Sequence, residues 1–164
     1  MNAEYLKELL SYNQDTGDFF WLVKRSNRIK IGDIAGYVNT YDGYRYINID
    51  NKMCKAHRLV WLYMTGSYPE FNIDHINNIR SDNRLANLRP CTQSENMCNR
   101  DKTLKNTSGY KGVSFHPETG KWRARIRKNG KTYSLGLYCT PHQASKAYRQ
   151  NCEVIHGEFA YAAS

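Results

Sequence analysis

The 164-residue sequence has no long hydrophobic run, and its N-terminus contains early acidic residues without a signal-peptide pattern. No apolar stretch approaches the ~20 residues that are needed to span a bilayer. We therefore expect a cytosolic protein with no membrane partner. The five cysteines are odd in number and contain no C-x-x-C pair, which argues against a disulfide framework and against a zinc cage.

Acidic residues are scarce in the last part of the chain. Residues 1–96 contain 12 Lys/Arg and 11 Asp/Glu, a net charge of +1, whereas residues 97–164 contain 12 Lys/Arg and 4 Asp/Glu, a net charge of +8. Together they give the formal charge of +9. A polyanionic partner is therefore expected mainly for the C-terminal part. Charge alone fits DNA, RNA or a membrane surface equally well.

The sequence divides into three segments and a linker. Residues 1–56 predict an amphipathic helix over residues 3–12 and then strands in DFFWLV, GYVNT and GYRYINID. Residues 57–100 begin with HRLVWLYMTG, whose apolar spacing predicts a helix that ends near Gly66. The polar, basic linker 101–107 precedes residues 108–164, which predict three strands and a helix.

Four polar residues within residues 71–100, FNIDHINNIRSDNRLANLRPCTQSENMCNR, supply the groups needed for metal-assisted phosphodiester cleavage. They are Asp74, His75, Asn87 and Asn96. A carboxylate can hold a hard cation, an imidazole can deprotonate water, and a carboxamide can hold that imidazole in place. The Thr-Gln-Ser-Glu pattern at residues 92–95 is a capping box, which predicts a helix that carries Asn96.

This segment resembles the HNH nuclease motif in the variant whose last member is Asn, as found in phage and intron-encoded homing endonucleases. The resemblance implies an α+β protein with a ββα-metal core preceded by a β-rich segment. It further implies that Asp74 and Asn96 bind a divalent metal, magnesium or manganese. His75 would then be the general base, and Asn87 would steady the loop that holds it or hydrogen-bond near it, without touching the metal.

Several residues in the same region remain ambiguous. Asp-His pairs and scattered asparagines are also common in ordinary turns, although here they occur together at the spacing of the motif. His57 has apolar neighbours, so a packed core histidine is favoured over a metal ligand. Arg80, Arg84 and Arg89 either hold phosphates or are ordinary loop residues, and Arg100 is expected to contact the DNA backbone.

The C-terminal segment has an alternating strand and clear turn signals. In KWRARIRK, Trp122, Ala124 and Ile126 alternate with three arginines, so one face is apolar and the other cationic. Asn-Gly at residues 129–130 predicts a tight hairpin, and Thr-Pro at residues 140–141 predicts the start of a helix. We expect a small three-stranded sheet packed on one helix.

Residues 108–160, with YKGV, WRARI, LGLY and an alanine-containing helix, resemble the plant APETALA/ethylene-response-factor type of DNA-binding domain. The resemblance implies DNA contacts through the cationic sheet face. The expected DNA-binding residues are Lys111, Ser114, Arg123, Arg125, Arg127 and Lys131. The plant domains have an acidic residue near Arg125 and a tryptophan near Ser134, both absent here, so their base preference does not transfer. A solvated strand face is the alternative.

The favoured hypothesis is a site-recognising, divalent-metal-dependent endonuclease of phage or mobile-element type, acting on double-stranded DNA in the cytosol of a bacterial host. With one quartet per chain, we expect a monomer that nicks one strand per binding event. The alternative is a catalytically silent, sequence-specific DNA-binding regulator. An RNA-binding protein is a third hypothesis, disfavoured because the cationic face carries arginines in place of aromatic residues.

Overall fold

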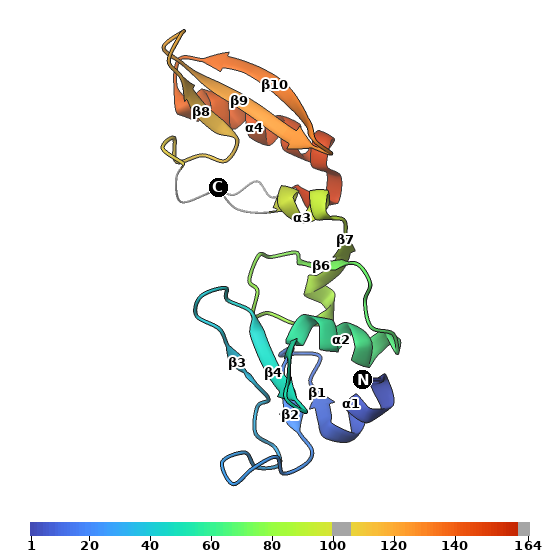
Figure 1. The fold of residues 1–164 in the computed structure, drawn as a ribbon. Coiled ribbons are helices and arrows are strands. Elements are labelled where there is room, and N and C mark those ends of the chain that lie inside the picture. Colours follow the sequence, from blue (N-terminus) through green and yellow to red (C-terminus); the bar gives the residue numbers. More distant parts are fainter. Residues whose placement is uncertain (100–105, 161–164) are drawn as a thin grey trace. The chain divides into compact units, whose positions relative to one another are not determined.

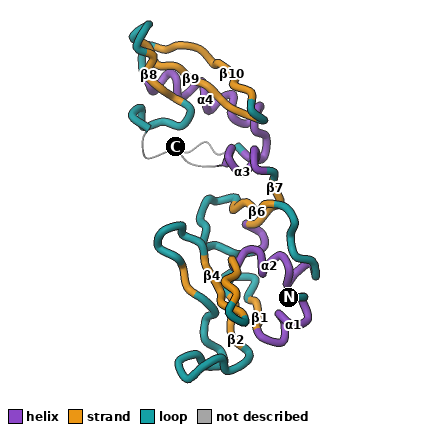
Figure 2. The backbone as a smooth tube through the Cα atoms, viewed as in Figure 1, coloured by secondary structure: helices purple, strands orange, loops and turns teal. Residues whose placement is uncertain are grey.

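The computed structural model describes residues 1–99 and 106–160, which form four α-helices and several small sheets in a mixed α+β arrangement (Figure 1). The chain separates into two compact units, residues 1–90 and residues 91–164. Figure 2 shows helices and strands in both units, with long loops between the strands of the first. No helix among the described residues is long and apolar enough to cross a membrane.

The first unit begins with α1 (Ala3–Leu9), which passes directly into β1 (Leu10–Tyr12). The predicted helix was therefore too long at its C-terminal end. Its last residues pair antiparallel with β2 (Phe19–Trp21), with Tyr12 opposite Phe19. Apolar residues at this spacing fit either structure, and pairing across the turn decides in favour of a strand.

The N-terminal segment is β-rich, as predicted. It continues with β3 (Tyr37–Val38), β4 (Arg45–Ile49) and β5 (Lys52–Lys55), which form one antiparallel sheet in that order. Helix α2 (Ala56–Thr65) follows and ends at Gly66, whose φ of 79° places it in the left-handed region. This end of α2 confirms the prediction, because glycine is favoured where a helix stops in that conformation.

The core of the first unit joins the N-terminal segment to α2. Its fully buried members include Leu6 of α1, Phe19 of β2, Ile47 of β4 and Leu59 of α2. Burying such side chains provides about 1.5–3 kcal/mol each relative to exposure. Next in the chain come β6 (Asn72–His75), a 3₁₀ turn at Leu85–Asn87 and β7 (Leu88–Cys91), with β6 and β7 paired in a two-stranded sheet.

The second unit contains α3 (Gln93–Asn99), β8 (Val113–His116), β9 (Lys121–Lys128), β10 (Lys131–Tyr138) and α4 (Pro141–His156), followed by a 3₁₀ turn at Gly157–Phe159. The strands form one antiparallel sheet in the order β10-β9-β8, which lies against α4 (Figure 1). A three-stranded sheet packed on one helix was the predicted arrangement.

Local signals of the second unit are confirmed at the predicted positions. Asn129 and Gly130 both have positive φ, 50° and 77°, as a tight β9–β10 hairpin requires. Thr140 forms a reciprocal capping box with Gln143 at the start of α4. Gly112, in the YKGV opening, lies so close to α4 that a Cβ atom there would come within 2.1 Å of the Tyr148 ring.

The boundary between the two units falls after Pro90, inside the predicted segment 57–100. Helix α3 therefore belongs to the compact unit of the C-terminal sheet, although the quartet motif that it completes begins in the first unit. Cys98 of α3 is buried with Cys91 and Phe159. The main-chain N–H of Asn129 donates to the hydroxyl of Ser94 at 3.0 Å.

Candidate functional site

Asp74 and His75 lie at the end of β6, and both side chains are almost fully buried. The Asp74 carboxylate is held by Arg89 on β7, whose Nε and Nη2 donate to Oδ2 at 2.9 and 2.8 Å. Their side chains are only 5% and 12% exposed, so this is a buried ion pair. Arg89, left ambiguous in the sequence, thus orients a predicted metal ligand.

His75 is enclosed by aromatic rings and by one buried amide. The rings of Tyr44 and His57 lie 5.8 and 5.1 Å from the His75 ring, centroid to centroid. The Nε2 atom of His75 lies 3.4 Å from Oδ1 of Asn83. Burial lowers the pKa of His75, an effect that the Asn83 contact and the Asp74 charge partly oppose. A neutral imidazole at neutral pH is the form that a general base needs.

His57 is packed in the core, as the sequence suggested. Burial, with smaller contributions from His75, Lys55 and Arg58, lowers the pKa of His57 to about 3. Its Nδ1 atom is buried without a hydrogen-bond partner among the described residues. His57 therefore lies beside His75 as a neutral ring.

Asn87 fastens the loop between β6 and β7. Its side-chain oxygen accepts from the N–H of Asn77 at 3.0 Å, and its Nδ2 donates to Oδ1 of Asn77 and to the main-chain oxygen of Asp82 at 3.0 and 2.9 Å. Its main-chain oxygen accepts from the N–H of Ile76, the residue after His75, at 2.9 Å. The amide thus ties together both sides of the loop that follows His75.

The other loop arginines have structural partners. Arg84 binds the Asp82 carboxylate through Nε and Nη2 at 2.8 and 2.6 Å, and this pairing lowers the pKa of Asp82 to about 2. Arg80 donates to the main-chain oxygen of Asp42 at 2.8 Å. Arg80 thus ties the loop to the main chain at Asp42, and Arg84 forms an ion pair within the loop.

Asn96 lies in the first turns of α3, within the second unit. The predicted capping box is confirmed, since the Thr92 N–H donates to Glu95 at 2.8 Å and the Glu95 N–H donates to the Thr92 hydroxyl at 3.2 Å. Asn96 itself is half-buried. Across residues 1–99 and 106–160, no group of three or more His, Cys, Asp or Glu side chains could hold a metal ion.

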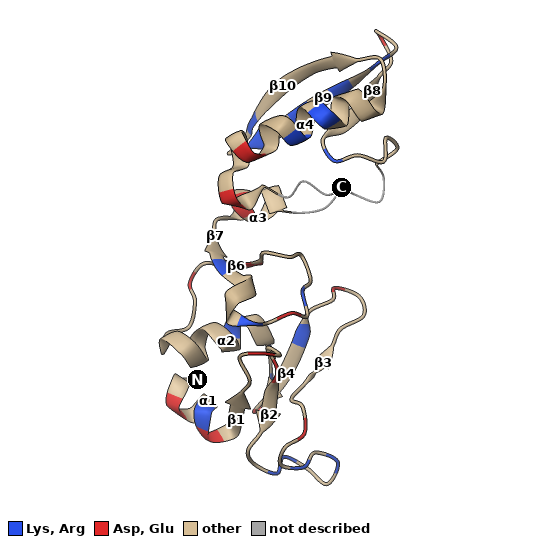
Figure 3. Cartoon of the chain, turned by 180° about the vertical axis from the view of Figure 1, so that it is seen from behind, with Lys and Arg blue, Asp and Glu red and all other residues tan. Residues whose placement is uncertain are grey.

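The central strand β9 separates its cationic and apolar residues, as the alternation predicted. Ala124 and Ile126 are buried against α4, whereas Arg125 and Arg127 are exposed. We call the side of β9 with Arg123, Arg125 and Arg127 the arginine face. Figure 3 shows Lys and Arg along β9. Among the described residues, the side chains of Arg125 and Arg127 have no hydrogen bond or ion pair.

At one end of the arginine face, Arg123 pairs across the strands with Ser114. The Nε atom of Arg123 and the hydroxyl of Ser114 are both buried without a hydrogen-bond partner among the described residues. Buried polar groups are normally hydrogen-bonded, so these two atoms are exceptions at this end of the arginine face. Lys131, at the start of β10, is exposed.

Lys111, one of the expected DNA contacts, is bonded within the second unit. Its ammonium donates to the main-chain oxygen of Cys98 at 2.6 Å, near the C-terminal end of α3, and Lys128 similarly donates to Ile155 near the end of α4. Such positions suit a cation because the last carbonyls of a helix lack partners within it. Arg100 lies outside the described residues.

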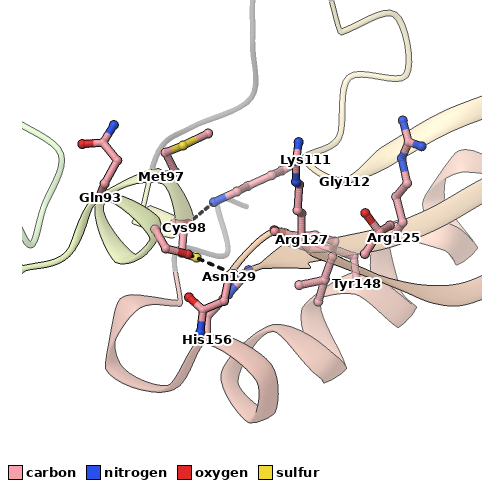
Figure 4. Close-up of a pocket in the computed structure, with 14 residues that line it drawn as sticks. Gln93, Met97, Cys98, Lys111, Gly112, Arg125, Arg127, Asn129, Tyr148 and His156 are labelled. Atoms are coloured by element: carbon pink, nitrogen blue, oxygen red, sulfur yellow. Dashed lines mark hydrogen bonds between the residues drawn. The ribbon is translucent and has the colours of Figure 1, made fainter.

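A cleft of about 740 Å³ opens between α3 and β9 within the second unit. In Figure 4, Arg125 and Arg127 point to one side of the strand, whereas Lys111 extends toward Cys98. Gln93 and Met97 of α3 also line this cleft. The arginine face is therefore continuous with a hollow that has α3 as its other wall.

Three side-chain contacts of the site were not expected from the sequence, although Arg89 itself was named there as a candidate. Arg89 holds Asp74, Asn83 contacts His75, and the Tyr12 hydroxyl donates to the main-chain oxygen of Asn83 at 2.9 Å. The Asn-rich composition of residues 77–87 was the available signal for Asn83. Nothing near Tyr12 in the sequence indicated a contact 71 positions away.

The sequence pattern of the HNH endonuclease family matches residues 54–98, which include the Asp74-His75 pair, Asn87 and Asn96. A relative named Protein 3.8, from Escherichia phage T7, is 33% identical over 110 residues, covering 66% of this chain and 90% of that protein. The chain belongs to the HNH endonuclease family. It is a nuclease with an AP2-like DNA-binding domain, since the AP2 domain pattern matches residues 108–157.

Two further relatives support the same two parts of this HNH endonuclease. An uncharacterized HNH endonuclease of Acanthamoeba polyphaga mimivirus is 29% identical over 116 residues, covering 70% of this chain and 59% of that protein. The APETALA2-like protein 2 of Oryza sativa subsp. indica is 43% identical over 42 residues, covering 26% of this chain and 10% of that protein. No solved structure matches the chain.

Proposed function

We propose that the chain is a site-recognising, divalent-metal-dependent DNA endonuclease of the homing type. The hydrolytic centre is the buried Asp74-His75 pair, and the arginine face of the second unit binds duplex DNA. The observation that carries the proposal is the burial of a carboxylate and a neutral imidazole side by side at the end of β6, inside a segment that matches the HNH endonuclease family.

His75 is the general base that takes a proton from the attacking water. Burial lowers the pKa of His75, so the neutral, proton-accepting form predominates at neutral pH. Asn87 supports this role by fastening the loop that follows His75, through its bonds to Asn77 and Asp82. Asn87 thus acts on the shape of the site without contacting the reacting groups.

Asp74 and Asn96 are the proposed metal ligands, completing the ββα-metal core of the family. HNH nucleases use a divalent ion, and one carboxylate with one carboxamide fits magnesium, or manganese in its place, because these ions keep several waters. The ion, when bound, stabilises negative charge on the phosphate and on the leaving oxygen. Arg89 keeps the Asp74 carboxylate fixed, as partners of metal ligands commonly do.

Duplex DNA is the proposed ligand of the arginine face. Arg123, Arg125 and Arg127 repeat every second residue along β9, and arginines on a strand that enters the major groove can bind guanine edges or phosphates. Ser114 and Lys131 border the same face. Lys111, because it is bonded to Cys98, supports the fold of this unit and does not lead its DNA contacts.

The proposed oligomeric state on DNA is a monomer, because one chain supplies one Asp74-His75 pair. One such centre hydrolyses one phosphodiester per binding event, so the expected product is a nick with a 5′ phosphate and a 3′ hydroxyl. A double-strand break would need a second chain or a second event.

Cleavage of supercoiled plasmid tests the proposal. The natural chain and the double variant Asp74→Ala, His75→Ala would be incubated with plasmid and with host and phage DNA, in magnesium, in manganese and in a chelator. Nicked circles that form only with the natural chain and only in the presence of metal support the proposal. Linear product would show double-strand cutting in place of the nicking that we propose. Tight duplex binding without cleavage on all these substrates would favour a catalytically silent DNA-binding regulator.

A further inference from the structure

The N-terminal segment contacts the loop between β6 and β7 at three consecutive residues. The Tyr12 hydroxyl donates to the main-chain oxygen of Asn83 at 2.9 Å and accepts from the N–H of Leu85 at 3.1 Å. Gly17 packs against the same stretch, because a Cβ atom there would lie 2.5 Å from the nitrogen of Arg84. The β1–β2 turn therefore holds this loop from outside.

The loop in turn presents a buried amide to His75. Asn83 is fully buried, and its Nδ2 donates to the main-chain oxygen of Ser81 at 3.0 Å. This bond fixes the orientation of the amide, so that Oδ1 faces Nε2 of His75 at 3.4 Å. Because an amide oxygen can only accept, this contact favours the neutral tautomer of His75 that carries its hydrogen on Nε2 and its lone pair on Nδ1.

Tyr12 is itself fixed by the core of the first unit. Its ring packs against Phe19 of β2 and Tyr63 of α2, at centroid distances of 5.1 and 5.9 Å. Antiparallel pairing places Tyr12 opposite Phe19. A continuous series of contacts thus leads from the core, through the Tyr12 hydroxyl and Asn83, to the imidazole of His75.

We propose that Tyr12, Gly17 and Asn83 are positioning residues of the nuclease, through which the N-terminal segment sets the tautomer and orientation of His75. This inference rests on the proposed role of His75 as general base. It gives the N-terminal segment a part in hydrolysis that is separate from any contact with DNA. Positioning matters because small displacements of a catalytic group cost large factors in rate.

The first test replaces Tyr12 with phenylalanine, which keeps the packed ring and removes only the hydroxyl. Tyr5→Phe is the matched control, because it removes a 2.7 Å hydrogen bond to Asp50 from the same segment. We expect Tyr12→Phe to slow single-turnover nicking at saturating DNA and magnesium about tenfold, with an unchanged Kd for duplex DNA in a chelator. Tyr5→Phe should cleave normally; equal rates for the two variants would overturn the inference.

The second test reads the imidazole directly, by nitrogen NMR of the His75 ring. The natural chain should show the hydrogen on Nε2. Asn83→Leu removes the acceptor oxygen, so it should lose this tautomer and slow nicking. A hydrogen on Nδ1 in the natural chain would contradict the inference.

The two tests separate this inference from the function on which it rests. In one outcome the natural chain never cleaves DNA, but it shows the Nε2 tautomer and Asn83→Leu loses it. That result would contradict the proposed catalysis and support the positioning contact. A chain whose cleavage needs His75 but is indifferent to Tyr12→Phe and to Asn83→Leu would retain catalysis and remove the contact.

Discussion

Acidification should destabilise the first unit through His57. This ring is 5% exposed and lies 5.2 Å from Tyr44 and 5.1 Å from His75, centroid to centroid. Burial first, then the nearby charges of His75, Lys55 and Arg58, lowers the pKa of His57 to about 3. In the unfolded chain the pKa returns to about 6.5, so only the unfolded chain binds this proton between these two values.

The sign and size of the effect follow from that difference. The contribution of the neutral His57 to the free energy of unfolding is fully present above about pH 6.5. It falls as the pH drops toward about 3, because the unfolded chain binds the proton more readily than the folded chain. At about pH 5, roughly 1.5 pH units below the unfolded value, the loss amounts to about 2 kcal/mol at about 1.4 kcal/mol per unit. His75, whose pKa burial also lowers, adds to the same trend.

Urea unfolding of a Trp122→Phe background measures this, because the remaining tryptophans, Trp21 and Trp61, both belong to the first unit. His57→Gln is the comparison, since glutamine stays neutral while every other titrating group remains. The free energy lost between about pH 7.5 and about pH 5 should be smaller by about 2 kcal/mol in His57→Gln. The same loss in both proteins would refute the reasoning.

Two further predictions concern the ion pair and the arginine face. Arg89→Met should lower the free energy of unfolding by about 3–5 kcal/mol, because it leaves the buried Asp74 carboxylate without its cation. The double variant Arg89→Met, Asp74→Asn should lose less free energy of unfolding than the two single variants lose in sum. Losses that simply add, as measured by urea unfolding, would contradict this. Replacing Arg125 and Arg127 with glutamine should weaken duplex binding, as measured by fluorescence anisotropy. The slope of the logarithm of the binding constant against the logarithm of the salt concentration should become less steep by roughly 0.9 per lost phosphate contact. Arg149→Gln, on the exposed side of α4, is the control and should change neither the affinity nor its dependence on salt. A loss of affinity in Arg149→Gln as large as in the β9 variant would contradict DNA binding by the arginine face.

Features that depend on neighbours within a few residues were predictable from the sequence. The end of α2 at Gly66, the Thr92–Glu95 capping box and the Asn129–Gly130 hairpin each result from local backbone preferences. The alternation along β9 likewise predicted that Ala124 and Ile126 are buried whereas Arg125 and Arg127 are exposed, because successive residues of a strand face opposite sides.

Contacts between distant parts of the chain were not predictable in this way. The ion pair between Asp74 and Arg89 and the bond from Tyr12 to Asn83 depend on how β1, β6 and β7 come together. No periodicity connects these positions. The last residues expected in α1 form a strand for the same reason, since pairing with β2 outweighs a helical pattern that is equally compatible with their sequence.

Packing also decided to which unit α3 belongs. In the sequence, α3 continues the quartet motif without a break, and the motif alone assigned it to the nuclease segment. Its buried Cys98 packs with Phe159, and Ser94 accepts from Asn129, so α3 is part of the compact unit that contains the C-terminal sheet. Sequence proximity predicted the motif correctly but not this packing partner.

A comparison of binding and cleavage in one variant tests the central claim most directly. His75→Ala and the natural chain would be bound to the same duplex in a chelator, and magnesium would then be added to start hydrolysis. We predict the same Kd for both proteins, nicking by the natural chain, and none by His75→Ala. Cleavage by His75→Ala at the natural rate would show that the buried Asp74-His75 pair is not the hydrolytic centre.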